Sequence, residues 1–202
     1  MQSTVGAVGK LGIQKIAAPK VGLGWKIQNL PNIMRGWRIP LALAFGIPTY
    51  YGKLSIRLKK ADGRVIDYGT VSYRSLTTAF VVFMTDQLQT ETSVFGDFKY
   101  HDSGTGAVAE NVTDTGMGTE STVQTGDVRF EGTQTEGAST NIYKSVATIT
   151  YDGSGAITEH GLFNNTRVGG GTLMDRTVFA AVNVASGDSI SFSFELTCTA
   201  GG

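Results

Sequence analysis

The stretch Ser189-Ile-Ser-Phe-Ser-Phe-Glu-Leu-Thr-Cys-Thr199, close to the C-terminus, decides the fold. Apolar and polar residues alternate strictly along it. Successive side chains of a strand point to opposite faces, so Ile190, Phe192, Phe194, Leu196 and Cys198 share one face. One buried and one solvated face is typical of an antiparallel sheet. We therefore expect a central strand here, with Cys198 as a small core residue rather than a nucleophile.

Further strand-length runs precede this one and are separated by turn sequences. The runs cover residues 54–58, 65–73, 142–151, 156–163 and 173–179. Asp62-Gly63 between the first two is typical of a hairpin turn, and glycine-rich segments such as Asp152-Gly-Ser-Gly155 separate the later runs. Several strands at close spacing favour a mainly β fold, an antiparallel β-sandwich or jelly roll.

One helix and one long loop are expected within this β body. Leu76, Phe80, Phe83 or Met84, and Leu88 recur at helical spacing after Ser75, a candidate N-cap, which predicts a short helix over 75–89. A strand is the alternative, because Val81, Val82 and Phe83 are poor helix formers. Residues 103–141 are rich in Gly, Thr, Ser, Asn and Asp, so we expect a loop-rich excursion in which only 128–130 suggests a strand.

Composition indicates one domain of ordinary size. The chain has 202 residues and 27 glycines without a three-residue repeat, which argues against collagen. A single cysteine excludes an internal disulfide and a zinc site built on several thiolates. Neither a signal peptide nor a membrane helix is expected, because no apolar run is long enough.

Charge is divided unequally along the chain. No Asp or Glu occurs before Asp62, whereas ten Lys and Arg do; the rest carries seven Lys and Arg against 17 Asp and Glu. Such a basic segment fits an acidic surface, on a neighbouring copy or another partner. An accident of composition on a solvated face is the alternative. Nucleic acid is not an expected partner, because the cations are spaced apart rather than clustered.

All four prolines fall within the first fifty residues, so we expect an extended or irregular arm over 1–50 and a body over 51–202. The arm is too apolar for a free tail, because it contains two tryptophans and the run 39–47. It must fold back across the body or dock on other subunits. The expected assembly contacts are Lys10, Lys15, Lys20, Trp25, Lys26, Arg35, Trp37 and Arg38.

Catalytic and cofactor signatures are weak, and we predict no enzyme, no metal and no cofactor. Asp102-Ser-Gly104 and Asp114-Thr-Gly116 carry the triplet of aspartic proteases but lie in a glycine-rich loop, where Asx-type turns are the better interpretation. The two histidines, His101 and His160, lack a serine elbow and form no recognisable metal site. The run Val168-Gly-Gly-Gly-Thr172 has no lysine, so it predicts a hairpin loop rather than a phosphate site.

Several blocks of sequence resemble a family of virion structural proteins of tailed bacteriophages, most of them without an assigned role. The blocks are Tyr100-His-Asp-Ser-Gly-Thr-Gly-Ala-Val-Ala-Glu-Asn-Val-Thr-Asp-Thr115, Gly132-Thr-Gln-Thr-Glu-Gly-Ala-Ser-Thr-Asn-Ile-Tyr143, Ile157-Thr-Glu-His-Gly-Leu-Phe163, Leu173-Met-Asp-Arg-Thr-Val-Phe179 and Asn183-Val-Ala-Ser-Gly-Asp-Ser189. The resemblance covers about residues 51–202. It implies a β-rich virion component with no catalytic site to carry over.

The basic, apolar arm and the resemblance of the β body together predict a capsid cement or decoration protein. Its partners would be copies of itself and the major capsid or other virion proteins, without a membrane, in a particle assembled in the bacterial cytoplasm. A neck or tail component, including a fibre base or adaptor, is the first alternative. A receptor- or glycan-binding module is the second, with 103–141 as its site, although Phe130 is the single aromatic residue that we expect that loop to present.

Overall fold

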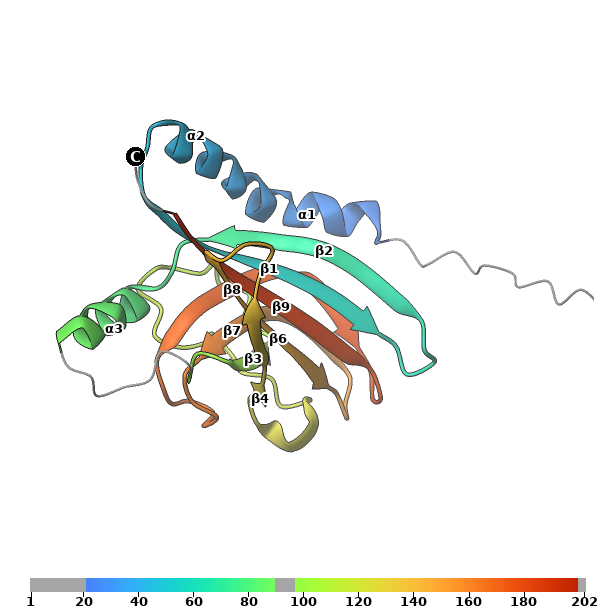
Figure 1. The fold of residues 1–202 in the computed structure, drawn as a ribbon. Coiled ribbons are helices and arrows are strands. Elements are labelled where there is room, and N and C mark those ends of the chain that lie inside the picture. The colour runs from blue at the N-terminus through green and yellow to red at the C-terminus, as the bar shows by residue number, and fades with distance from the viewer. Residues whose placement is uncertain (1–20, 90–96, 200–202) are drawn as a thin grey trace, which may run out of the picture.

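The computed structural model describes residues 21–89 and 97–199 and shows two antiparallel sheets stacked as a β-sandwich, which confirms the predicted mainly β fold (Figure 1). The strands are β1 (Thr49–Lys59), β2 (Val65–Arg74), β3 (Tyr100–Gly104), β4 (Phe130–Glu131), β5 (Thr133–Glu136), β6 (Ile142–Thr150), β7 (Gly155–Phe163), β8 (Leu173–Val184) and β9 (Ser189–Thr199). One sheet has the order β2-β1-β9-β6-β5 and the other β4-β3-β7-β8. The helices are α1 (Leu23–Met34), α2 (Arg38–Ala44) and α3 (Thr78–Gln89), with 3-10 turns η1 (Arg35–Trp37) and η3 (Thr125–Asp127).

Strand β9 lies in the middle of the five-stranded sheet, as its alternation predicts. It pairs with β1 from Thr199 to Ser189 and with β6 on its other side. Ile190, Phe192 and Phe194 are fully buried between the sheets. Cys198 is half-buried at the edge of the core, and burial raises the pKa of its thiol above the usual value. A thiol with a raised pKa is a poor nucleophile at neutral pH, in line with a packing role.

The predicted hairpin is confirmed by β1 and β2. Its turn places Gly63 at a φ of 85°, a left-handed conformation that glycine adopts without strain. Asp62 completes the turn because its carboxylate accepts a hydrogen bond from the Arg64 backbone N–H at 3.0 Å. The sequence Asp62-Gly63 therefore directs the chain reversal as expected.

The predicted short helix is also confirmed, and the strand alternative is wrong. Helix α3 begins at Thr78, three residues after the predicted cap Ser75. Thr77 caps it instead, since its hydroxyl accepts a hydrogen bond from the Phe80 backbone N–H at 3.2 Å. The aromatic rings of Phe80 and Phe83 both pack edge-on against Phe98, with ring centroids 4.8 Å apart in each pair. This contact with the core outweighs the poor helix propensity of the valines between them.

The expectation of an extended or irregular chain over the first fifty residues is wrong for residues 23–44, which are helical; residues 1–20 lie outside the described part of the chain. Pro40 is tolerated because it stands in the first turn of α2, where backbone N–H groups need no partner inside the helix. Pro31 lies inside α1 and removes one backbone hydrogen bond. Contacts between α1 and the body offset that loss.

The expected excursion at 103–141 is largely loop, with η3 and the short strands β4 and β5 inside it. It lies against the body. Residues between β3 and β4 cover the face of β7 that points away from the core, where the buried carboxylate of Glu159 accepts hydrogen bonds from the backbone N–H groups of Gly106, Gly118 and Thr119 at 2.7 to 3.0 Å. The guanidinium of Arg176 also donates to Glu159, at 2.8 Å. One carboxylate therefore anchors the loop at two places along its length, at Gly106 and at Gly118 with Thr119.

Candidate functional site

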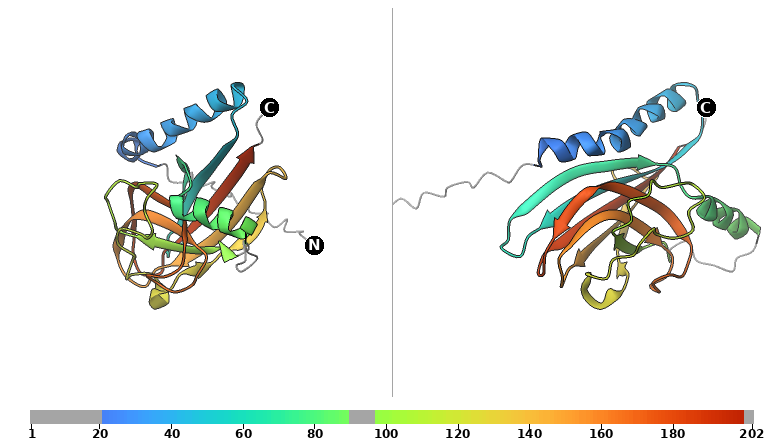
Figure 2. Two further views of the ribbon diagram at one scale, coloured as in Figure 1. Left: turned by 90° about the vertical axis from the view of Figure 1, so that its left-hand side faces the viewer. Right: turned by 180° about the vertical axis from the view of Figure 1, so that it is seen from behind.

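Helix α1 lies across the open side of the sandwich and joins the free edges of the two sheets (Figures 1 and 2). Fully buried Asn29 donates to the carbonyl of Val71 on β2 at 2.5 Å and accepts from the backbone N–H of Ala180 on β8 at 3.3 Å. Asn32 donates to the Val178 carbonyl at 2.7 Å. Unpaired backbone groups at sheet edges invite association with other strands. Asn29 and Asn32 thus pair with one backbone group at the edge of one sheet and two at the edge of the other.

The opposite side of the same helical segment is apolar and exposed. Six residues spaced four and three apart form a stripe, here called the outward face: Leu23, Ile27, Leu30, Met34, Trp37 and Leu41. Their exposed fractions lie between 48% and 73%. An ordinary surface helix turns its apolar side to the core and its polar side to water. This segment does the reverse, so its outward face makes no contribution to the core of the described structure.

The predicted assembly residues divide into two groups. Lys26, Trp37 and Arg38 are exposed, and neither cation has an ion pair among the described residues. Trp25 instead contacts the body: its indole N–H donates to the Ala180 carbonyl at 2.8 Å, and its ring packs on Tyr68. Arg35 pairs with Glu110 at 2.6 Å. Lys10, Lys15 and Lys20 lie outside the described residues.

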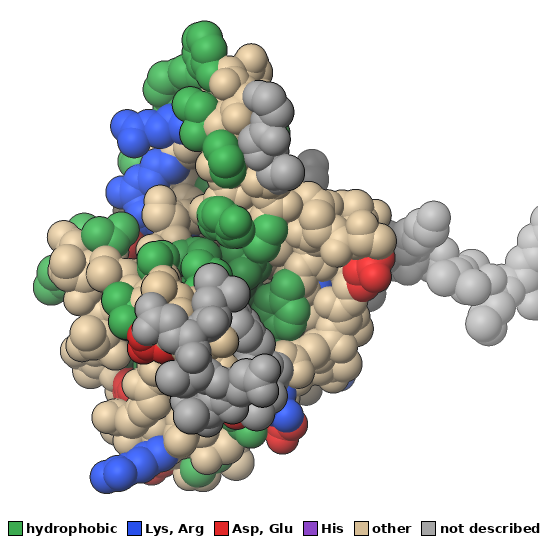
Figure 3. Space-filling model, turned by 60° about the vertical axis from the view of Figure 1, so that its left-hand side comes forward, with side chains coloured by type: hydrophobic (Ala, Val, Ile, Leu, Met, Phe, Trp, Pro, Cys, Tyr) green, Lys and Arg blue, Asp and Glu red, His purple; other side chains and the backbone are tan. Residues whose placement is uncertain are grey.

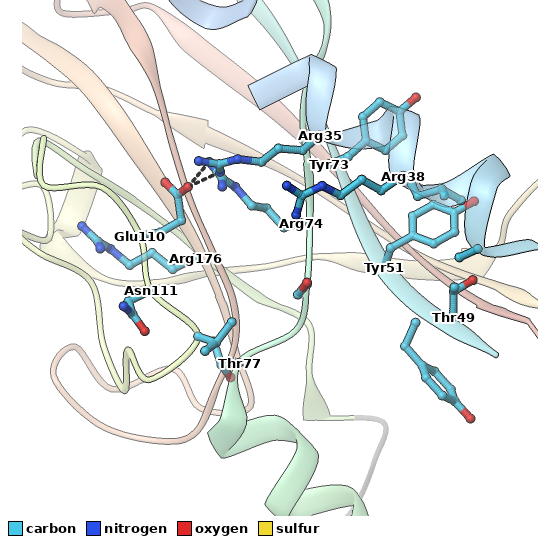
Figure 4. Close-up of a pocket in the computed structure, with 15 residues that line it drawn as sticks. Arg35, Arg38, Thr49, Tyr51, Tyr73, Arg74, Thr77, Glu110, Asn111 and Arg176 are labelled. Carbon is cyan, nitrogen blue, oxygen red and sulfur yellow. Dashed lines mark hydrogen bonds and ion pairs between the residues drawn. The ribbon is translucent and has the colours of Figure 1, made fainter. Parts of the chain in front are cut away.

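A pocket of about 370 Å³ lies beside α2, between the adjoining ends of β1 and β2 and the loop after β3 (Figure 4). Arg35, Arg38, Arg74 and Arg176 line it together with a single acid, Glu110. Aromatic and apolar side chains complete the walls, among them Ile39, Ala42, Tyr50, Tyr51 and Tyr73. Burial raises the pKa of Glu110 above its usual range, although the neighbouring arginines act in the opposite direction.

Hydrophobic side chains also gather on the surface around this region. Figure 3 shows them on the helical segment at the top of the molecule and on the surface below it, with Lys and Arg side chains beside them. Phe45 and Ile47, which follow α2, are exposed, and so is Tyr50 at the start of β1. Contiguous exposed apolar surface of this kind marks interaction sites on folded proteins.

The expectation of a glycine-rich loop with an Asx-type turn is wrong for Asp102-Ser-Gly104, which lies in strand β3 and pairs with β7. The two aspartates of the protease-like triplets therefore occupy different environments. Asp102 is fully buried, where Gln124 donates to it at 2.8 Å and Arg129 lies 3.3 Å away. Burial raises the pKa of Asp102 to about 6 despite these partners. Asp114 is half-buried in the loop and pairs with Arg176 at 2.9 Å. Each aspartate thus forms an ion pair with a different arginine. An aspartic protease site needs two equivalent carboxylates that share a proton, and Asp102 and Asp114 do not form such a pair.

The two histidines lie together inside the sandwich. His101 Nδ1 and His160 Nε2 are 2.9 Å apart, and His101 Nε2 is 2.8 Å from the Ser145 hydroxyl. Both rings are fully buried, and burial lowers the pKa of His101 to about 3 and that of His160 well below its usual value. Neutral imidazoles that share a hydrogen bond form a polar layer in the core. Neither ring reaches the surface.

None of the helices described here is both long and apolar enough to cross a membrane. Across residues 21–89 and 97–199, no three His, Cys, Asp or Glu side chains are grouped so that they could hold a metal ion.

Comparison with protein-family models, with curated proteins and with solved structures found no match for this chain. The likeness to virion proteins therefore rests on the sequence blocks quoted above and stays a prediction.

The buried Asp175 predicts a measurable pH dependence of stability. One carboxylate oxygen has no hydrogen-bond partner, the other accepts from the Thr177 hydroxyl at 2.9 Å, and burial, with Glu110 nearby, raises the pKa to about 7. The folded state therefore binds a proton more strongly than the unfolded chain, whose aspartate pKa is about 3.9. The stability that Asp175 contributes is lost as the pH rises between these values, by at most about 1.4 kcal/mol per pH unit.

Asp175→Asn should remove this dependence. We expect the variant to gain in stability relative to the natural chain as the pH rises from 4 to 7, measured by denaturant unfolding at several pH values. The buried histidines have lowered pKa values, which change stability with pH in the opposite direction. Their contribution is the same in both proteins, so it cancels in the difference between the two free energies of unfolding. A difference that does not change with pH would contradict the prediction.

Proposed function

We propose that the protein is a non-enzymatic structural component of a tailed bacteriophage particle, a capsid cement or decoration protein that docks through the outward face of α1 and α2. The observation that carries the proposal is the orientation of the helical segment. Its polar side chains contact the body, and its apolar outward face is exposed. The resemblance of the β body to virion structural proteins supports a tailed bacteriophage as the particle to which the protein belongs.

Charge supports an acidic docking partner. The first 61 residues carry ten cations and no anion, and Lys26 and Arg38 flank the outward face without partners among the described residues. Pairing this face with its own copy would bring like charges together. An apolar surface bordered by Asp and Glu on a neighbouring subunit of the particle would bury the stripe and neutralise the cations. Many weak contacts of this kind gain strength through avidity on a repeating shell.

Leu30→Glu tests the docking face. Leu30 is 48% exposed and contributes little to the core, so we expect the stability of the free protein to change by no more than about 0.5 kcal/mol. Incorporation into particles should fall about tenfold or more, because a carboxylate is placed in the centre of the apolar stripe. Val128→Glu is the matched control, since Val128 is 49% exposed and lies outside the outward face. Normal incorporation of Leu30→Glu would overturn the proposal.

Copy number and shell strength test the cement role. Quantitative mass spectrometry of purified particles should find hundreds of copies, and shells without the protein should rupture more readily on heating. About a dozen copies or fewer would indicate a neck or tail component instead. Unchanged shell strength without the protein would contradict cementing, and absence of the protein from particles would contradict a virion role.

A further inference from the structure

We infer that the arginine-lined pocket beside α2 is a socket for a carboxylate, presented by an acidic side chain of the docked partner. This inference deepens the proposed function and rests on it for the source of the carboxylate. The pocket itself is defined by the geometry of the chain alone.

The pocket holds more positive charge than its own acid can balance. Arg35 and Arg74 both contact the same oxygen of Glu110, while the other oxygen of Glu110 accepts from the Val178 backbone N–H at 3.1 Å. Arg176 is engaged by Asp114 and Glu159. Arg35, Arg38 and Arg74 therefore face one carboxylate, which leaves an excess of two positive charges.

Two of these arginines have unused hydrogen-bonding capacity. The side chain of Arg74 is only 9% exposed, and its Nε has no hydrogen-bond partner. The Arg38 guanidinium has no partner among the described residues and extends toward the place where Arg35 and Arg74 meet Glu110 (Figure 4). Leaving the buried Nε–H of Arg74 without an acceptor is costly, so a carboxylate that accepts from it would relieve a penalty already present in the free protein.

The walls favour a carboxylate carried on an apolar stem. The rings of Tyr51 and Tyr73 lie with centroids 6.4 Å apart, and Ile39 and Ala42 of α2 line the same space. A guanidinium binds a carboxylate through two parallel hydrogen bonds, and the surrounding apolar walls exclude water and strengthen that pair. A volume of about 370 Å³ accommodates an acidic side chain with adjoining residues but not a folded element.

The first test uses citrate as a soluble carboxylate probe on the full chain. At matched ionic strength, citrate at about ten times its Kd should raise the unfolding temperature by at least about 3 °C relative to sodium chloride. Arg38→Gln should abolish that shift, whereas the control Arg57→Gln, an exposed arginine on β1 outside the pocket, should keep it. No shift with citrate, or a shift that survives Arg38→Gln, would overturn the inference. An equal, Arg38-dependent shift with inorganic phosphate would also overturn the assignment to a carboxylate.

The second test separates the socket from the docking face. We expect Arg38→Gln to lower incorporation into particles by about tenfold and Arg57→Gln to leave it unchanged. If Leu30→Glu blocks incorporation while Arg38→Gln incorporates normally, the partner does not fill the socket and the inference fails, but the proposed function stands. If Leu30→Glu incorporates normally, the proposed function fails whatever citrate does.

Discussion

Glu159→Ala is expected to lower the free energy of unfolding by about 3 to 5 kcal/mol, because it removes one partner of a buried ion pair. Glu159 is fully buried, and Arg176 with only 4% of its side chain exposed would lose its closest counter-charge. Three backbone N–H groups of the loop would lose their acceptor at the same time. Unpaired buried donors add their own desolvation cost. Denaturant unfolding monitored by circular dichroism measures the change.

The control for this substitution is Glu136→Ala. Glu136 lies exposed on β5 and should contribute within about 0.5 kcal/mol. The loss of stability in Glu159→Gln should lie between those of Glu159→Ala and Glu136→Ala. The amide oxygen still accepts hydrogen bonds, but the negative charge is lost. If Glu159→Ala and Glu136→Ala unfolded at the same denaturant concentration, the anchoring role of Glu159 would be wrong.

Phe192→Ala should cost about 3 to 5 kcal/mol of stability, since it leaves a cavity in the middle of the core. Phe192 is fully buried on β9, with the rings of His160 and Phe179 at centroid distances of 4.7 and 6.4 Å. Its neighbour Ser193 lies on the other face of the strand, so Ser193→Ala should change stability by no more than about 0.5 kcal/mol. Thermal melts of the two variants decide the matter. Equal melting temperatures of Phe192→Ala and Ser193→Ala would contradict the assignment of Phe192 to the buried face of β9 and Ser193 to the opposite face.

The β body could be predicted from the sequence because its strands carry their signal locally. Alternation in β9 and the Asp62-Gly63 turn each involve neighbours in the chain, and both predictions are confirmed. The helical conformation of residues 23–44 does not follow as directly, because the four prolines of the first fifty residues indicate an irregular chain. The signal for it in the sequence is the apolar spacing of Leu23, Ile27 and Leu30, which continues to Leu41.

The sequence predicts only part of the candidate site, for a physical reason. Lys26, Trp37 and Arg38 are exposed where a partner could contact them, as expected of assembly residues, and their role stays a prediction. Asn29 cannot be recognised from the sequence, because its hydrogen bonds go to backbone groups of β2 and β8, which no local pattern reveals. Glu110 and Arg74 form one pocket although 36 positions separate them in the chain, and this proximity follows from the tertiary fold alone.

The two sides of α1 also have different freedom to evolve. Residues such as Asn29 hold the sheets and are constrained by the body, whereas the residues of the outward face are exposed and lie outside the core of the described structure. Substitutions that retarget the stripe to a new surface would leave the fold intact. Substitutions along the outward face of α1, η1 and α2 could therefore adapt the same body to different particles. An engineer could place a new binding surface there without redesigning the core.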